Sequence, residues 1–405
     1  MALKRSGVRF SLAPPFPLRR PLLYLDTRAL TKQGRRGSVA GRRGWRRTIQ
    51  SYGRDLRPLS VGLGAGGTIL LGLVLRRHHQ RAGTADLDLH HVERMTPLGA
   101  APAGQPVTVA SADGTALHAE VFGPGDAPTI VLAHGWLGTS AVWHHQVRAL
   151  SEHHQVVVYD QRGHGRSHPA AGDDYSCDAL AADLDAVFGA AVPPGEKVVV
   201  AGHSMGAMAV VDWACAHPAE LSERLAGVAL VNVGVEDLIR RSTLVLFPVA
   251  LATLRAVVGE RVLTAPLSLP RRTTPVLSRL VKAVALGRTA SPAQVALCAR
   301  MLLGTPTDVR AAFGATLSTF DLAHGLPALT VPTVVVAGEH DRLTPPVHAR
   351  AIAAAVPGST LAELPGVGHM APIEAHAEVT DAIHRLAEGV FAPHRLDDHA
   401  SKGQG

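Results

Sequence analysis

Short runs of β-branched apolar residues recur along the chain from Val107 onward, and longer segments of helical texture separate them. The runs have the length and composition of strands buried on both faces of a sheet, and they lie at 129–133, 155–159, 198–201, 228–233, 333–337 and 360–364. Strands that alternate with helices predict a mostly parallel sheet covered by helices on both faces. We therefore expect an α/β fold with a sheet of about eight strands.

The first two strands are predicted to form a hairpin. Val107–Ala110 and Leu117–Val121 flank Asp113-Gly114, a dipeptide typical of tight turns between paired strands. The hairpin opens an α/β core that spans residues 105–235 and 326–392. Residues 393–405 are expected to be a loose polar tail.

Residues 236–325 interrupt the alternation with helical texture and no strand of comparable strength. An insertion between two strands of a parallel sheet is expected to lie over the carboxyl ends of the strands, where such sheets hold their sites. We therefore predict a helical cap. Its apolar residues suit an acyl chain or another hydrophobic substrate, although packing between helices explains them equally well; they are Leu244, Val245, Leu246, Phe247, Leu251, Leu254, Phe313 and Phe320.

The N-terminal part of the chain has a different composition. Residues 1–57 are rich in Arg, Pro and Gly and show no apolar period, so we expect them to be disordered. Three explanations stay open: a basic anchoring tail, an Arg-rich targeting peptide, or a start codon placed too far upstream, which we favour because no helical moment supports targeting.

A hydrophobic segment with basic flanks follows at 58–81, and 82–104 has the composition of a linker. Val61–Leu75 holds no charge, but it is at the lower limit for spanning a bilayer and five of its residues are Gly. Two interpretations stay open, a membrane anchor within 58–75 and a hydrophobic helix packed on the body. We expect a cytoplasmic protein, with membrane association through this segment as the alternative.

Charge and cysteine content exclude several classes of function. Residues 1–81 hold 18 Lys and Arg against Asp26 and Asp55, a net charge of +16, whereas the whole chain is +7, so the remainder is −9. An acidic body disfavours a nucleic-acid partner. The three cysteines lie far apart and no H-E-x-x-H motif occurs, so we predict neither a disulfide framework nor a metal, and no cofactor.

The strand at 198–201 runs directly into Gly202-His203-Ser204-Met205-Gly206 and then into helix formers. A strand that becomes a helix within five residues must turn sharply at Ser204, and glycines on either side remove the Cβ atoms that would clash. Such a turn presents the hydroxyl at the positive end of a helix, as in a nucleophile elbow. Alone the motif is weak evidence, because a tight strand-to-helix turn with a solvent-facing, non-catalytic serine would have the same sequence pattern.

A serine becomes a nucleophile only beside a base that an acid orients. Two loops that follow later strands supply these groups, the first at 337–342 with Asp341 and the second at 366–372 with His369. The oxyanion of a tetrahedral intermediate also needs two donors. We expect them to be the backbone N–H of Met205, after the serine, and that of Trp136, in the loop after the strand at 129–133.

These motifs resemble those of the α/β-hydrolase fold family, specifically its capped serine hydrolases, over about Val107 to Glu388. The chain shows an H-G-x loop at 134–136, a D-x-R-G-x-G-x-S loop at 160–167, the elbow, a G-x-x-D loop at 338–341 and a G-H loop at 368–369. The resemblance implies Ser204 as nucleophile, Asp341 as acid and His369 as base.

Rival residues lie inside the same motifs. Glu339 precedes Asp341 by two positions, but the family pattern favours Asp341. His203 is expected to point away from the elbow, and His134 to brace the oxyanion loop. Asp237 is an alternative acid, because some relatives place the acid after the preceding strand. The remaining polar residues are interpreted as structural: Asp160, Arg162, His164 and His340.

A serine nucleophile disfavours the chemistries that need a carboxylate to form an alkyl ester. We therefore expect hydrolysis of a small, hydrophobic carboxylic ester through an acyl-enzyme, an esterase or lipase-like activity. Thioester cleavage, carbon–carbon bond hydrolysis and cofactor-free haloperoxidase chemistry stay open on this fold, as does a catalytically silent binding protein. The oligomeric state stays open as well.

Overall fold

The structure, a computed structural model, describes residues 9–12, 104–242, 259–261, 263–266, 269–270 and 272–401, with residues 9–12, 240 and 393–401 as backbone only. All of them belong to one compact unit. The hydrophobic segment 58–81 and the linker up to residue 103 lie outside the described residues, as do six of the eight apolar residues predicted for the insert, those from Leu244 to Leu254. Among the helices that are described, none is both long and apolar enough to cross a bilayer.

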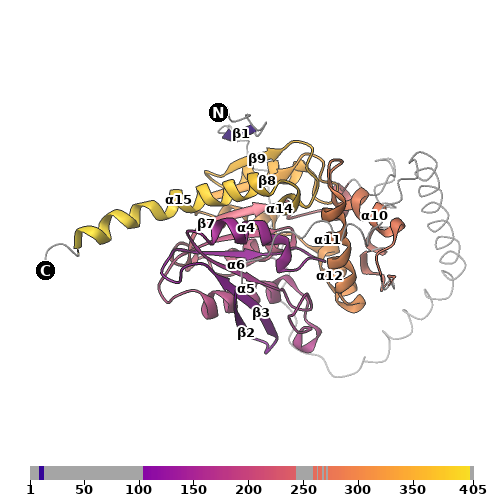
Figure 1. Ribbon diagram of the computed structural model, residues 1–405, viewed down its shortest axis with the longest axis horizontal. Coiled ribbons are helices and arrows are strands. Elements are labelled where there is room, and N and C mark those ends of the chain that lie inside the picture. The colour runs from indigo at the N-terminus through magenta and orange to yellow at the C-terminus, as the bar shows by residue number, and fades with distance from the viewer. Residues whose placement is uncertain are drawn as a thin grey trace, which may run out of the picture. The chain divides into compact units, whose positions relative to one another are not determined.

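The described strands form one sheet in the order β1-β9-β8-β7-β6-β4-β5-β3-β2 (Figure 1). The strands are β1 (Arg9–Leu12), β2 (Gln105–Ala110), β3 (Ala116–Phe122), β4 (Thr129–Ala133), β5 (Gln155–Tyr159), β6 (Val198–His203), β7 (Leu225–Val231), β8 (Thr333–Gly338) and β9 (Thr360–Leu364). β4 through β9 pair in parallel, and the predicted hairpin β2–β3 pairs antiparallel. The predicted α/β fold with its mostly parallel sheet is therefore confirmed.

β1 is a strand that the sequence analysis did not predict, within a segment expected to be disordered. It pairs antiparallel with β9, with Arg9 opposite Glu363 and Leu12 opposite Thr360. An edge strand presents a row of unpaired N–H and C=O groups, and a short extended segment can satisfy them. A segment of four residues is too short to show a periodic pattern, so the sequence alone did not predict this strand.

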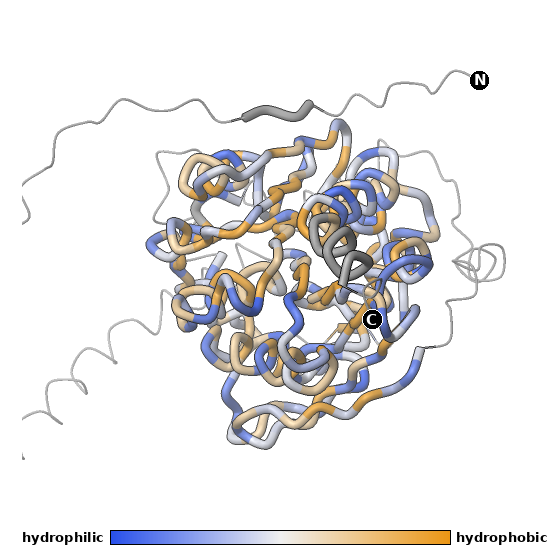
Figure 2. Tube along the Cα trace, turned by 90° about the vertical axis from the view of Figure 1, so that its left-hand side faces the viewer, coloured by the Kyte–Doolittle hydropathy of each residue, from blue (hydrophilic) through white to orange (hydrophobic). Residues whose placement is uncertain are grey.

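Helices cover both faces of the sheet. α4 (His144–Leu150) and α15 (His376–Ser401) lie on one face, and α5 (Cys177–Ala191), α6 (Met205–Ala216) and α13 (Pro346–Ala355) lie on the other. The central strands alternate between the two cores, so that in β4 Val131 and Ile130 point to opposite faces. In the trace coloured by hydropathy, the covering helices carry both hydrophobic and hydrophilic residues (Figure 2).

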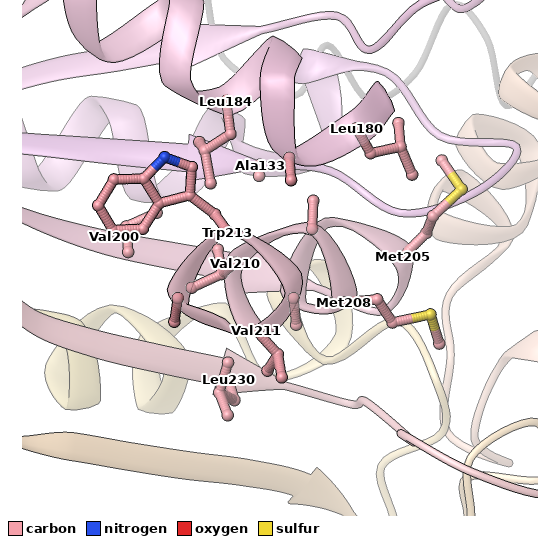
Figure 3. Close-up of a cluster of buried hydrophobic side chains, with 14 of the residues drawn as sticks. Ala133, Leu180, Leu184, Val200, Met205, Met208, Val210, Val211, Trp213 and Leu230 are labelled. Carbon is pink, nitrogen blue, oxygen red and sulfur yellow. The ribbon is translucent and has the colours of Figure 1, made fainter. Parts of the chain in front are cut away.

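The helix behind the elbow is almost wholly buried. α6 packs beside α5 and against β6 of the sheet, and Figure 3 shows its Val210, Val211 and Trp213 among Leu184, Val200 and other apolar side chains. Trp213 and Val210 are fully buried. Because the helix is fixed in this core, the residue at its N-terminus, Ser204, is held in place as well.

The described part of the insert 236–325 is helical and follows β7 and precedes β8 along the chain. It comprises α8 (Leu238–Arg241), α10 (Pro275–Ala285), α11 (Pro292–Gly304), α12 (Thr307–Thr319) and part of the 3₁₀ helix η5 (Ala323–Ala328), and Figure 1 shows α10, α11 and α12 grouped together. α10 and α11 begin at Thr274 and Ser291, whose side chains cap the first turn. The insert contacts the loops that follow β5 and β9: Thr316 Oγ1 donates to Tyr175 O at 2.8 Å and Ala285 O accepts from His369 N at 2.9 Å.

α15 continues to Ser401, so residues 393–401 of the expected loose tail are helical instead. Pro393 lies within this helix; a proline removes one intrahelical hydrogen bond but still allows helical residues on both sides. The shorter elements of the core are η2 (Ser140–Trp143), η3 (Ala171–Asp173), α7 (Leu221–Arg224) and α14 (Ala371–Glu374).

Candidate active site

Ser204 has the strained backbone of a nucleophile elbow. Its φ of 51° and ψ of −117° lie in a region that residues with a Cβ rarely adopt. The flanking glycines are required by contact: a Cβ on Gly202 would lie 2.4 Å from Ala207 Cα, and one on Gly206 would lie 2.3 Å from Ala133 O. The serine is only partly buried, so the turn exposes it where β6 ends and α6 begins.

Asp341 and His369 are brought together from the loops after β8 and β9. His369 Nδ1 lies 2.8 Å from Asp341 Oδ2, and both side chains are buried. Burial alone would raise the pKa of Asp341, but neighbouring His369 and the hydrogen bonds from His369 and Thr344 hold it below its usual value. A carboxylate that stays ionised orients the ring with its Nδ1 protonated and leaves Nε2 as a base.

Two residues that hold Asp341 escaped the sequence analysis. Asn232 follows β7 with a positive φ of 48°, and its Nδ2 donates to Asp341 Oδ2 at 2.8 Å and to Gly368 O at 3.2 Å. Thr344 Oγ1 lies 2.7 Å from Asp341 Oδ2, and the backbone N–H groups of Leu343 and Thr344 donate to Oδ1. A polar residue directly after a buried strand was the available signal for Asn232, which we had included in the strand.

The serine and the histidine lie in neighbouring loops but are not hydrogen-bonded. Ser204 Oγ has no hydrogen bond within the described residues. His203, the preceding residue, is in contact with the base: its ring centroid lies 5.0 Å from that of His369. Hydrogen bonds between nucleophile and base are often long in enzymes without substrate.

The predicted oxyanion loop lies against the serine. A Cβ on Gly135 would lie 2.9 Å from Ser204 Cβ. His134 is fully buried beneath the loop: its Nδ1 donates to Gly135 O at 2.8 Å and its Nε2 accepts from Gln161 N at 2.9 Å. Trp136 directly follows Gly135, the residue that lies against Ser204, and Met205 begins α6 directly after the serine. Helix-terminal N–H groups such as that of Met205 have no partner inside their helix.

The loop after β5 is structural, as we interpreted it. Arg162 is buried and binds both oxygens of Asp183, at 2.7 and 2.6 Å. Asp160 accepts the backbone N–H groups of Ser140 and Arg166. His164 accepts from Leu137 N at 3.2 Å and thereby supports the oxyanion loop from its other end.

The rival acids lie elsewhere. Glu339 is exposed and accepts from Gly366 N at 2.9 Å, and His340 is exposed beside it. Asp237 is exposed at the start of α8, and Asp341 takes the hydrogen bond to His369. Over the part of the chain that the structure describes, no group of three or more His, Cys, Asp or Glu side chains is arranged to hold a metal ion.

Sheet order, elbow and acid–base pair together define a class of protein, and the comparison with known families agrees. The sequence profile of the alpha/beta hydrolase fold family matches residues 128–376. The chain therefore belongs to the alpha/beta hydrolase fold family.

Several relatives are similar over most of their own length. The "Putative carbamate hydrolase RutD" of Variovorax paradoxus is 30% identical over 282 residues, which are 68% of this chain and 98% of that protein. A thermophilic esterase from Thermogutta terrifontis is 26% identical with a TM-score of 0.57, over 71% of this chain and 99% of the esterase. An enol-lactonase from Burkholderia xenovorans LB400 is 26% identical with a TM-score of 0.53, over 69% and 99%.

Proposed function

We propose that the protein is a serine hydrolase that cleaves small, hydrophobic carboxylic esters through an acyl-enzyme on Ser204. The observation that carries the proposal is the 2.8 Å contact between His369 Nδ1 and Asp341 Oδ2 in the loops beside a strained serine elbow. A buried, oriented imidazole next to a partly exposed serine has the parts needed for nucleophilic attack on a carbonyl.

In the first half of the proposed reaction, His369 Nε2 takes the proton of Ser204 Oγ as the oxygen attacks the ester carbonyl. The negative charge that develops on the carbonyl oxygen is stabilised by the backbone N–H groups of Trp136 and Met205. His369 then gives the proton to the departing alcohol, and the acyl group remains on Ser204. Asp341 stabilises the imidazolium that exists between these steps.

In the second half, His369 takes a proton from water, and the hydroxide attacks the acyl-enzyme. Collapse of the second tetrahedral intermediate returns the proton to Ser204 and releases the acid. Every step uses side chains and backbone of this chain, so the proposal needs no metal or cofactor.

A carbamate is the second candidate substrate, because the relative from Variovorax paradoxus carries that activity in its name. A carbamate offers the same carbonyl to Ser204, with an amine or alcohol as the leaving group. The esterase and the enol-lactonase among the similar structures favour an ester. We therefore place the ester first. Thioester cleavage and carbon–carbon bond hydrolysis follow the same first attack.

A substrate panel tests the proposal. Turnover of p-nitrophenyl acetate, butyrate and octanoate is compared with that of an aryl carbamate, a thioester and a vinylogous diketone. We expect ester hydrolysis, lost in Ser204→Ala and retained in Ser278→Ala, which alters a buried serine whose hydroxyl makes no hydrogen bond among the described residues. Preference for the carbamate would instead select the second candidate, and inertness toward the whole panel would favour a silent binding protein.

A further inference from the structure

Glu374, at the end of α14, accepts hydrogen bonds from two separate segments of the chain. Its Oε1 accepts from the backbone N–H of Met370 at 3.0 Å. Its Oε2 accepts from Gly368 N at 3.3 Å and from Gly287 N at 2.6 Å. Gly368 and Met370 flank His369, whereas Gly287 lies just beyond α10 of the insert. One carboxylate therefore joins the loop that carries the candidate base to the insert.

The same two segments also pack directly against each other. The N–H of His369 donates to Ala285 O at 2.9 Å. A Cβ on Gly368 would lie 2.4 Å from Gly287 N, and a Cβ on Gly287 would lie 2.3 Å from Gly366 O. Neither glycine has room for a side chain, so the two backbones are in contact along this stretch.

A second contact from the insert reaches α14 itself. Gln294 of α11 donates from Nε2 to Ile373 O at 2.8 Å, one residue before Glu374. Arg342, next to Asp341, donates to Ala283 O at the end of α10. The loops that carry both Asp341 and His369 are therefore bound to the segment 283–294.

The three backbone N–H donors around Glu374 favour a carboxylate at this position. A carboxylate has acceptors on both oxygens and no donor, so it can serve three N–H groups at once. Burial raises the pKa of Glu374, while the N–H groups of Gly287, Gly368 and Met370 act in the opposite sense. A glutamine would direct its NH₂ group toward at least one of these donors and would lose that bond.

We propose that Glu374 is a positioning residue that sets the location of the His369 imidazole relative to Ser204 by fixing the His369 loop against the insert. The role of the imidazole rests on the proposed function, but the linkage between loop and insert does not. A displacement of about 1 Å at a reacting group can lower a rate by about 100-fold. The insert thereby becomes part of the support for the base.

The experiment compares Glu374→Gln with wild type in the full chain, using two readouts. The first is chemistry: the rate constant for labelling by a fluorophosphonate and the kcat for p-nitrophenyl butyrate should each fall at least about 10-fold, with KM within about 2-fold. The second is hydrogen exchange: peptides covering 283–290 and 364–376 should exchange faster than in wild type. A purely structural role would lower the melting temperature without this division between kcat and KM.

The matched control is Glu339→Gln. Glu339 is exposed and accepts from Gly366 N in the same loop, but it makes no hydrogen bond to the insert within the described residues; its kcat should stay within about 2-fold of wild type. Gly287→Ala disrupts the same contact between loop and insert, but from the insert side. The double variant Gly287→Ala/Glu374→Gln should lose no more kcat than the worse of the two single variants, because both substitutions disrupt the same contact.

Each outcome has a distinct meaning. If wild type is not labelled at all, the proposed function is wrong, and the exchange data still test the linkage. If wild type is labelled and Glu374→Gln reacts at the same rate, or exchanges at the same rate, the positioning role is wrong. Should Glu374→Gln fail to fold, Glu374→Asp keeps the charge with a shorter reach, and a wild-type kcat in that variant would also overturn the proposal.

Discussion

His203 Nε2 donates a hydrogen bond to the carbonyl oxygen of His369 at 2.8 Å, so the residue before the candidate nucleophile holds the residue that carries the candidate base. A carbonyl can only accept, which places the proton on Nε2. Burial lowers the pKa of His203 to about 3, and neighbouring His369 adds to the effect. His203 is therefore a neutral brace between the β6 elbow and the β9 loop.

Replacing His203 should lower kcat clearly while changing the melting temperature only a little. His203→Phe keeps a ring but removes the donor, leaving the His369 carbonyl unpaired, and we expect kcat for an ester to fall about 10-fold because the base is less well placed. The same substitution at His340, an exposed residue of the β8 loop, is the control. Steady-state kinetics and thermal melting check both variants, and an unchanged kcat in His203→Phe would refute the bracing role.

The elbow glycines should tolerate no side chain. In Gly206→Ala the new Cβ would lie 2.3 Å from Ala133 O and 2.6 Å from His134 O, so we expect a loss of at least about 1–3 kcal/mol in the free energy of unfolding. Gly189→Ala, in α5, is the matched control: its Cβ would meet nothing within 4 Å, and it should be neutral or stabilising by up to about 1 kcal/mol. Urea unfolding measures both. Equal effects would mean that the elbow is not under this constraint.

The buried ion pair of the β5 loop should contribute far more than an exposed one. Arg162→Met leaves Asp183 buried without its partner, and we expect a loss of about 3–5 kcal/mol in unfolding free energy. Arg350→Met breaks the exposed pair with Glu363 and should cost less than about 1 kcal/mol. Denaturant titrations of the two variants give the comparison, and similar losses would show that the buried pair is not integral to the loop.

Buried neutral histidines should make the protein sensitive to mild acid. Burial, with His134 nearby, lowers the pKa of His164 to about 3, whereas an unfolded histidine titrates near pH 6.5. Between these values the unfolded chain binds a proton that the folded chain does not, so the unfolding free energy falls as pH falls, by up to about 1.4 kcal/mol per pH unit for this residue.

His164→Gln should therefore reduce the slope of unfolding free energy against pH by up to about 1.4 kcal/mol per pH unit between pH 6 and 4.5, which corresponds to the loss of one proton-binding group. His168→Gln, at an exposed position of the same loop, serves as the control. Urea unfolding at several pH values gives the slopes. Parallel curves for wild type and His164→Gln would show that His164 is not held neutral by the fold.

The sequence was most informative where one chemical pattern has one structural solution. The β-branched runs predicted the central strands because parallel strands are buried on both faces, and the glycines around Ser204 predicted the turn because a Cβ there meets backbone. Asn232 and Glu374 were not predicted, since each acts through contacts between segments far apart in the chain. β1 escaped for the same reason, because its pairing with β9 is non-local. Thr344 contacts Asp341 within the same loop, but no pattern in the sequence distinguished it from other loop residues.

The most direct test of the account is the site at which a fluorophosphonate attaches. Intact mass and peptide mapping should find one adduct, on Ser204, absent in Ser204→Ala and formed at least about 100-fold more slowly in His369→Gln, because the serine then lacks its base. Asp341→Asn should slow labelling as well. An unlabelled but folded wild type, an adduct on another residue, or full-rate labelling of His369→Gln would contradict the assignment of Ser204, His369 and Asp341 to one reaction centre.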